Sequence, residues 1–308
     1  MGQGKPEQRD ITKKILDLKK DRNAVILAHL YQRPEIQEIA DFVGDSLQLS
    51  QQAAGTKADV IVFCGVHFMA ESASILSPDK TVLLPEENAG CLMADMITAA
   101  DLRQAKTALP GAVVVCYVNS SAEIKAESDI CCTSSNAVKV VQSLPETSKI
   151  LFVPDRNLGH YVRSKTGRDI RFWEGHCPTH QKISVRDILA VKEKYPEAKV
   201  LVHPECRPDV VDLADAVYST AGMMKFAADS AASSFIIGTE SGLLHQLRKR
   251  CPNKRFVLAS RNLVCPNMKA TTMDKVLRAL ERMEPRVEVP VEIREKALSS
   301  LERMLAVG

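Results

Sequence analysis

One pattern occurs three times along the chain and limits what the chain can fold into. Each copy begins with a short apolar run rich in β-branched residues, and these runs start at Ala24, Ala112 and Ala198. The two intervals are 88 residues, from 24 to 112, and 86 residues, from 112 to 198. Self-similarity at a fixed period indicates tandem modules of one design.

The polar residues of the pattern keep the same spacing. Two sets do so: Asp41, Asp129 and Asp215; and Ser46, Ser134 and Thr220. Three cysteines, Cys91, Cys177 and Cys265, recur at the similar intervals of 86 and 88 residues. We expect each hydroxyl residue of the second set to cap a helix, because Ser and Thr are favoured at helix N-termini.

Each copy continues with two more strand-like runs and a helix start, so strands alternate with helices. This alternation predicts parallel βαβ units. The fold class we expect is α/β, with three tandem homologous αβα domains that are Rossmann-like, contain parallel sheets and surround a pseudo-threefold axis with the active site at the centre. The expected boundaries are 1–97, 98–183 and 184–271, followed by C-terminal helices over 272–308. The helix expected over 272–283 resembles the helices that start modules two and three, so we expect it to close the third module.

Candidate binding residues follow the predicted strands. In open parallel sheets ligands bind beyond the carboxyl ends of the strands. The residues found there are His29, Tyr31, Tyr117, Asn119, His203 and Glu205. At a helix start, Ser46, Ser134 and Thr220 would attract anions. Gly238–Gly242, of sequence GTESG, is a weak signal for phosphate at another helix start.

The repeated cysteines Cys91, Cys177 and Cys265 are candidate metal ligands. Loop-forming residues flank them, whereas Cys64, Cys116, Cys131, Cys132, Cys206 and Cys251 read as packing residues. Three thiolates suit a soft metal or an iron–sulfur cluster and leave one coordination position open for catalysis. Of the histidines without an assigned role, His180 is closest in sequence to a ligand.

Composition argues against several classes of partner. With 41 basic and 38 acidic residues the formal charge is only +3, which gives no basic stripe for nucleic acid. No apolar run approaches the roughly 20 residues of a membrane helix. The beginning of the chain has no apolar signal core, and none of the nine cysteines forms a CxxC pair, so we expect a cytoplasmic protein.

Several motifs together resemble the quinolinate synthase family. They are HLYQRPEIQEIADFVGDSL, CGVHFMAE, PEENAGCLMADM, CYVNSSAEIKAESD, WEGHCPTH, HPECRPDVVDLAD, GTESGLLHQL and CPNMK, which run from Ala28 nearly to Lys269. The resemblance implies a transferase-type enzyme of NAD biosynthesis that condenses iminosuccinate with dihydroxyacetone phosphate. It also implies a [4Fe-4S] cluster on Cys91, Cys177 and Cys265, with its fourth iron free for substrate.

The resemblance further implies roles for individual side chains. Those implied to contact iminosuccinate are His29, Ser46, Tyr117, Asn119, Ser134, His203, Glu205 and Thr220. Tyr31 and Glu205 resemble the proton-transfer partners, with His203 beside Glu205 in the catalytic set. Some members carry further cysteines near the second cluster ligand; here His180 takes that place, so no redox switch of that kind is expected.

The residues allow the same chemistry independently, since each step of the condensation is a proton-transfer problem. Glu205 is our candidate general base, because burial raises the pKa of a carboxyl group. The expected partners are the two small substrates and, for transient hand-over of iminosuccinate, an aspartate-oxidising enzyme. Two alternatives remain at this point: a zinc-dependent lyase that uses the same cysteines, and a non-catalytic iron–sulfur sensor or carrier.

Overall fold

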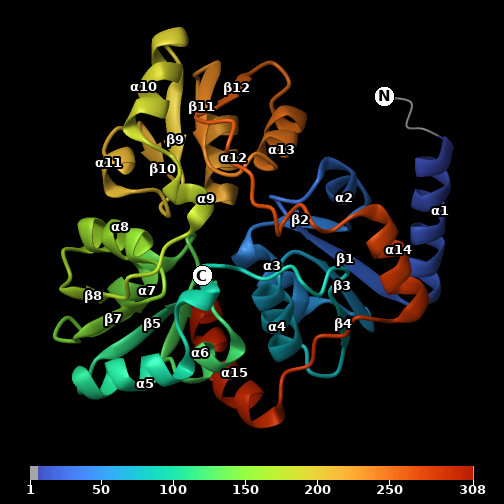
Figure 1. Cartoon of the computed structure of the whole chain (residues 1–308), viewed down its shortest axis with the longest axis horizontal. Coiled ribbons are helices and arrows are strands. Elements are labelled where there is room, and N and C mark those ends of the chain that lie inside the picture. The colour runs from blue at the N-terminus through green and yellow to red at the C-terminus, as the bar shows by residue number, and fades with distance from the viewer. Residues whose placement is uncertain (1–5, 308) are drawn as a thin grey trace. The chain divides into compact units, whose positions relative to one another are not determined.

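Three sheets of identical topology form the framework of the protein. A computed structural model describes residues 6–307, and each of its three sheets has four parallel strands with helices between them (Figure 1). The strand orders are β2-β1-β3-β4, β6-β5-β7-β8 and β10-β9-β11-β12. The prediction of three tandem parallel α/β modules is therefore confirmed.

The strands fall where the repeat places them. In the first module they are β1 (Ala24–His29), β2 (Phe42–Gly44), β3 (Val60–Cys64) and β4 (Thr81–Leu83). In the second they are β5 (Val113–Tyr117), β6 (Ile130–Cys132), β7 (Ile150–Val153) and β8 (Ile170–Phe172). In the third they are β9 (Lys199–Val202), β10 (Ala216–Val217), β11 (Ser234–Gly238) and β12 (Arg255–Leu258).

Helices connect these strands. The first group is α1 (Pro6–Asp21), α2 (Pro34–Ile39), α3 (Ser46–Gly55), α4 (His67–Leu76) and a 3₁₀ turn, η1 (Ala94–Met96). The second group is α5 (Ala99–Ala108), α6 (Ala122–Ala126), α7 (Ala137–Ser143), α8 (Arg156–Thr166) and α9 (Pro178–Gln181). The third group is α10 (Val185–Lys194), α11 (Pro208–Val211), α12 (Thr220–Asp229) and α13 (Leu243–Arg250), followed by α14 (Met273–Arg282) and α15 (Val291–Val307).

The repeated aspartates have one structural role in all three modules. Asp41 accepts a hydrogen bond from the backbone N–H of Ile26 in β1, at 2.8 Å. Asp129 and Asp215 accept the equivalent bonds from Val114 and Val200, also at 2.8 Å. Each aspartate lies just before a short strand, and its carboxylate accepts a hydrogen bond from a backbone N–H of the neighbouring strand. This shared role explains why the aspartates recur at the module spacing.

The short strands β2, β6 and β10 were not predicted. They contain only two or three residues. A segment of that length shows no alternation of apolar and polar residues that could distinguish a strand from a turn.

The chain forms two compact units. The first runs to Cys91 and takes in Pro266–Val291, and the second covers Leu92–Cys265 and the chain from Glu292 onward. The first unit contains the first sheet, and the second unit contains the other two. The module boundaries given above remain a prediction.

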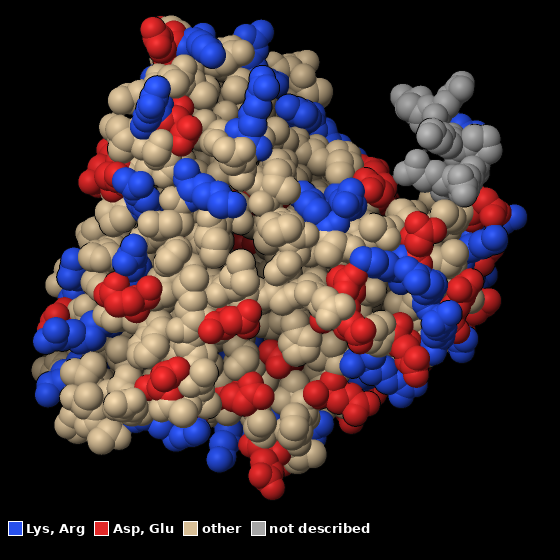
Figure 2. Space-filling model, viewed as in Figure 1, with Lys and Arg blue, Asp and Glu red and all other residues tan. Residues whose placement is uncertain are grey.

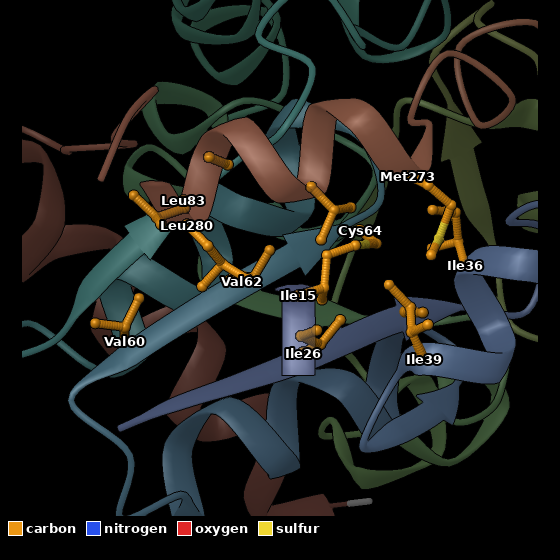
Figure 3. Packing of buried hydrophobic residues seen from close by; sticks show 13 residues of the cluster. Ile15, Ile26, Ile36, Ile39, Val60, Val62, Cys64, Leu83, Met273 and Leu280 are labelled. Carbon is orange, nitrogen blue, oxygen red and sulfur yellow. The ribbon is translucent and has the colours of Figure 1, made fainter. Parts of the chain in front are cut away.

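The core of the first unit corrects our expectation for α14. Figure 3 shows Met273 and Leu280 of α14 packed with Ile15 of α1, Ile26 of β1 and Val62 of β3. α14 therefore covers the first sheet and does not close the third module. The buried face of α14 has apolar residues three and four positions apart, a pattern that can pack on any uncovered sheet surface. The periodicity alone therefore could not predict which of the three sheets α14 would cover.

The C-terminal helix α15 packs in the second unit against the second module. The Ser300 hydroxyl donates to the Lys125 carbonyl at 2.9 Å, and the Asn136 amide donates to the Met304 carbonyl at 3.3 Å. Ser300 and Met304 are fully buried. α15 therefore has a packing role.

The expected helix caps are displaced. Asp45 caps α3 with a reciprocal bond to Gln48, and Ser219 caps α12 by accepting from the Gly222 N–H. Ser46 and Thr220 are instead the first helical residues, and Ser134 lies in the turn before α7. Asp45 and Ser219, which precede Ser46 and Thr220, have the extended backbone conformation that a cap requires, and the repeat spacing does not reveal this.

Charged side chains of both signs are interspersed over the face shown in Figure 2. Among the described residues, no helix combines the length and the apolar character that crossing a membrane would require.

Candidate active site

The predicted site residues are divided between the two units. His29, Tyr31, Ser46 and Cys91 belong to the first unit, and Tyr117, Asn119, Ser134, Cys177, His203, Glu205, Thr220 and Cys265 belong to the second.

In the first unit, His29 and Tyr31 lie at the end of β1 and contact each other. The Tyr31 backbone N–H donates to Nδ1 of His29 at 3.1 Å, and the two rings meet edge to face with centroids 4.6 Å apart. Because Nδ1 accepts this bond, a neutral His29 carries its proton on Nε2. Both side chains are buried, and Lys269 donates to the Tyr31 carbonyl. This strand end therefore holds an imidazole donor beside a phenol.

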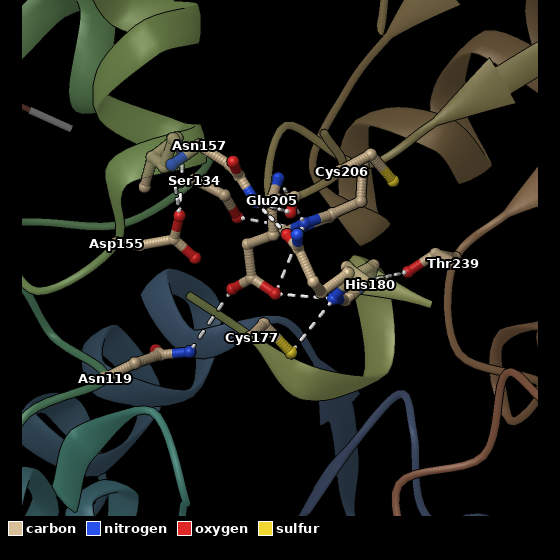
Figure 4. Close-up of polar contacts among 12 residues, drawn as sticks. Asn119, Ser134, Asp155, Asn157, Cys177, His180, Glu205, Cys206 and Thr239 are labelled. Atoms are coloured by element: carbon tan, nitrogen blue, oxygen red, sulfur yellow. Dashed lines mark hydrogen bonds and ion pairs between the residues drawn. The ribbon is translucent and has the colours of Figure 1, made fainter. Parts of the chain in front are cut away.

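In the second unit, polar side chains converge on the buried carboxylate of Glu205. The Tyr117 hydroxyl donates to its Oε1 at 2.5 Å, and the Asn119 amide lies 3.4 Å from the same oxygen. Nδ1 of His180 lies 2.6 Å from its Oε2 (Figure 4). Glu205 is only 3% exposed. These contacts bring together residues from β5, α9 and the segment after β9, as expected for a site at strand ends.

His203 repeats the geometry of His29. Its Nδ1 accepts from the Glu205 backbone N–H at 3.3 Å, as Nδ1 of His29 accepts from Tyr31. Its Nε2 lies 3.2 Å from the Ser134 hydroxyl, and its ring stacks on His180 with centroids 4.7 Å apart. The backbone turn after β1 and after β9 therefore fixes the ring orientation of both histidines in the same way.

The electrostatics of Glu205 correct our reason for assigning it as a base. Burial alone would raise the pKa of its carboxyl group, but the imidazoles of His180 and His203 and the hydrogen bonds from His180 and Tyr117 hold that pKa below its ordinary value. Glu205 is therefore ionised at neutral pH. The expectation of a raised pKa considered burial without the histidine and tyrosine donors.

Asp155 and Asn157 support this cluster from the start of α8. Asp155 caps the helix by accepting from the N–H groups of Asn157 and Leu158, and the Asn157 amide donates to the Glu205 carbonyl at 3.0 Å. Complete burial, together with the nearby charge of Glu205, raises the pKa of Asp155 well above its usual range. Asp155 Oδ2 and Asn119 Oδ1 are buried without a hydrogen-bond partner among the described residues.

His180 is a central residue of the site, although the sequence left its role open. α9 begins with Pro178 and turns His180 back toward Cys177, whose Sγ lies 3.2 Å from its Nδ1. Nε2 of His180 is 2.8 Å from the hydroxyl of Thr239. His180 lies three positions after Cys177. On a helix this spacing is about one turn and places the two side chains side by side, which was the available signal.

The GTESG segment does not provide the phosphate site that the motif suggested. The Gly242 N–H, just before α13, donates to Oε2 of Glu240 at 2.7 Å. Glu240 is fully buried. Its carboxylate already occupies the position at which a phosphate would meet this helix start.

The cysteines separate into two groups by exposure. Cys91, Cys177 and Cys265 are partly exposed, whereas the six cysteines assigned to packing are buried. Burial raises the pKa of the Cys64 thiol to about 12. Burial also acts to raise the pKa of Cys116, but hydrogen bonds from Cys131, Ser120 and Ser128, together with the charge of Lys125, lower that pKa to about 7. The three repeated thiols are thus the accessible ones. In the first unit, the loop before Cys91 is held by the Asn267 amide, which donates to the Gly90 carbonyl at 2.7 Å.

Ligand atoms of Cys177, His180 and Glu205 lie within 4.8 Å of one another, as in a group able to hold a metal ion. The 2.6 Å between His180 and Glu205 is a hydrogen-bond distance. Two ligands of one tetrahedral zinc ion lie about 3.3 Å apart. The present arrangement of these two side chains is therefore that of a proton-sharing pair.

Two of the three hydroxyl residues of the repeat lie at helix starts. Ser46 and Thr220 begin α3 and α12, helices of ten residues each. The Ser135 hydroxyl, adjacent to Ser134, donates to the Ser219 hydroxyl at 2.8 Å. This bond joins the second and third modules beside Ser134 and Thr220.

Comparison with known proteins identifies the family. The family model described as quinolinate synthetase A protein matches residues 13–306. A quinolinate synthase of Desulforudis audaxviator is 58% identical over 298 residues, covering 97% of this chain and 98% of that protein. A quinolinate synthase of Methanosarcina barkeri is 59% identical over 301 residues, covering 98% and 99%. A third, from Geotalea uraniireducens, is 56% identical over 300 residues, covering 97% and 98%. With a match that spans nearly the whole chain, this protein belongs to the quinolinate synthase family.

Proposed function

We propose that the chain is a quinolinate synthase of NAD biosynthesis, which condenses iminosuccinate with dihydroxyacetone phosphate and releases phosphate and water. The observation that carries the proposal is the family match over residues 13–306. The cluster around Glu205 is consistent with it, because a phenol, an amide and two imidazoles surround one carboxylate. These groups provide the hydrogen-bond donors and proton carriers that the reaction requires.

The proposed cofactor is a [4Fe-4S] cluster bound by Cys91, Cys177 and Cys265. The donor set fits this group, since iron–sulfur clusters take thiolates and these three thiols are the accessible ones in the chain. When bound, such a cluster with one open iron supplies a Lewis acid. The proposal also rests on the nearly equal spacing of the three cysteines in the repeat, at intervals of 86 and 88 residues.

The substrate iminosuccinate carries two carboxylates and so needs several hydrogen-bond donors. His29 and His203 are suited to this, because Nδ1 of each accepts a backbone bond, which places the proton of a neutral ring on Nε2. Nε2 of His203 lies 3.2 Å from the hydroxyl of Ser134, another proposed substrate contact. The other proposed substrate contacts are Tyr117, Asn119, Ser134, Glu205, Ser46 and Thr220. Ser46 and Thr220 begin helices, and the N-terminus of a helix favours a negatively charged group.

We assign proton transfer to Tyr31, His203 and Glu205. Because Glu205 is ionised at neutral pH, it is always in the form that accepts a proton. Its lowered pKa makes it a weaker base, so proton transfer to it requires that substrate displace at least one of its present donors. The phenol of Tyr31, beside His29, is the proposed proton donor to a substrate oxygen.

A zinc-dependent lyase is the second candidate, and one observation favours it. Cys177, His180 and Glu205 have the ligand types of a catalytic zinc site. The short contact between His180 and Glu205 argues against it, because this contact would have to lengthen before both could bind one ion. A non-catalytic iron–sulfur sensor has no use for a buried acid–base cluster of this kind.

The test is an anaerobic assay with an aspartate-derived imine and dihydroxyacetone phosphate, with quinolinate measured as the product. Iron and acid-labile sulfide are determined in the same sample. Quinolinate formation with both iron and sulfide supports the proposal, zinc without sulfide supports the lyase, and iron and sulfide without product support the sensor. We further propose a cytoplasmic location and transient hand-over of iminosuccinate from an aspartate-oxidising enzyme, which a coupled assay with that enzyme would test.

A further inference from the structure

Two buried polar residues, Thr239 and Glu240, follow β11, and the proposed chemistry does not use them. Both are fully buried. β11 packs closely against β9 just before them, since a Cβ at Gly238 would lie 2.8 Å from Cγ1 of Val202. This close approach makes the end of β11 a well-defined support for the two side chains.

The Glu240 carboxylate binds the backbone of the loop that carries Cys265. Its Oε1 accepts from the Cys265 N–H at 3.2 Å, and its Oε2 accepts from the Gly242 N–H at 2.7 Å. The Ser241 hydroxyl also donates to Oε1, at 3.2 Å. A buried carboxylate is costly unless such bonds satisfy it. The geometry of the Cys265 loop is therefore tied to the position of this one side chain.

Thr239 is linked through His180 to Cys177, the other proposed ligand cysteine of this unit. Its hydroxyl lies 2.8 Å from Nε2 of His180, and Nδ1 of the same ring is 3.2 Å from Sγ of Cys177. Neighbouring residues on one strand end thus contact the Cys265 segment and the Cys177 segment.

We propose that Glu240 is a positioning residue that fixes the Cys265 thiol for cofactor binding, and that Thr239 does the same for Cys177 through His180. This inference rests on the proposed function for the identity of the cofactor. The anchoring itself consists of contacts within the chain. Residues that orient metal ligands without touching the metal commonly change metal affinity by about 10- to 100-fold when they are removed.

The variants that test the inference are Glu240→Gln, Glu240→Ala and Thr239→Val, with Ser241→Ala as the control. Glutamine keeps one oxygen acceptor for two N–H donors, whereas alanine keeps none. Valine matches the shape of threonine without its hydroxyl. Ser241→Ala removes only a donor to Glu240 and leaves both backbone bonds to the carboxylate in place.

The first measurement is the alkylation rate of each cysteine in the metal-free protein, followed by mass spectrometry. We expect Cys265 to react about fivefold faster or more in Glu240→Ala, as for loss of one buried backbone hydrogen bond. Glu240→Gln should be intermediate, and Ser241→Ala unchanged. Thr239→Val should accelerate Cys177 and leave Cys265 unchanged.

The second measurement is the rate at which a chelator removes iron from the anaerobically loaded protein. We expect an increase of about 10- to 100-fold in Glu240→Ala and a smaller one in Glu240→Gln. Should Glu240→Ala fail to fold, as judged by circular dichroism, the shape-matched glutamine variant decides. Wild-type rates of Cys265 alkylation or of iron release in the folded variants overturn the proposal. A wild-type protein that binds no iron refutes the proposed function instead, and the alkylation measurement still tests the anchoring.

Discussion

Replacing Glu205 with glutamine removes the carboxylate on which the second-unit cluster converges, at nearly unchanged volume. In the wild type, one oxygen accepts from Tyr117 at 2.5 Å and the other lies 2.6 Å from His180. Glutamine has one oxygen and one NH₂ group, so it can accept from only one of these two partners. Whichever of Tyr117 and His180 is left over then faces the NH₂ group of the glutamine, which cannot accept its hydrogen bond.

The size of the effect follows from the lost interactions. Loss of a hydrogen bond to a buried charged group costs about 1.5–3 kcal/mol. Loss of a positioned proton acceptor lowers a rate by about 10²- to 10⁴-fold. Glu205→Gln should therefore reduce quinolinate formation by at least about 10²-fold. Its iron content should stay at the wild-type value, because none of the three proposed ligand thiols is changed.

The assay is the initial rate of quinolinate formation by anaerobically loaded protein, with iron determined in the same sample. Glu174→Gln is the matched control, since the Glu174 side chain is 79% exposed and pairs with Arg156 at the surface. The control should keep wild-type activity. A Glu205→Gln protein with full iron and undiminished turnover would refute the role assigned to this carboxylate.

Three further predictions concern the framework. Leu280→Ala should lower the free energy of unfolding, measured by chemical denaturation, by about 2–5 kcal/mol, because Leu280 is a fully buried residue of α14. An equal loss in Leu16→Ala, whose side chain is exposed, would contradict this. Asp129→Ala should cost about 1–3 kcal/mol by leaving the Val114 N–H without its acceptor, whereas the same measurement on the exposed Asp169→Ala should show little change. Burial would raise the pKa of Asp215, but Lys199 and the Val200 N–H lower it overall; its contribution to stability is complete above about pH 4 and is lost as the pH falls through the lowered pKa. In Asp215→Asn, the free energy of unfolding should therefore fall less steeply than in the wild type as the pH is lowered. Asp209→Asn is the control, and a pH dependence of Asp215→Asn equal to that of the wild type and of this control would be inconsistent with the prediction.

The sequence was sufficient to predict the module architecture because the repeated residues have a repeated physical role. Asp41, Asp129 and Asp215 each satisfy a strand N–H, so their spacing follows the strands. The placement of α14 was wrong because a helix with an apolar face carries no information about which of three similar sheets it will cover.

The candidate site was predictable where residues lie at strand ends. Tyr117, Asn119, Ser134, His203 and Glu205 come together in the second unit as that rule requires. The direction of the pKa shift of Glu205 was not predictable, because it depends on His180, which is 25 positions away in the chain. The role of Glu240 was also hidden, since its partner Cys265 is equally distant in sequence and is reached through a backbone N–H.

The central claim is that three distant thiols hold one catalytic cluster. The most direct measurement is iron and acid-labile sulfide per chain in anaerobically purified wild type, Cys265→Ser and the control Cys251→Ser, whose cysteine is buried. The account predicts about four iron and four sulfide in the wild type and in the control, with loss of both in Cys265→Ser. Unchanged iron and sulfide in Cys265→Ser would contradict it.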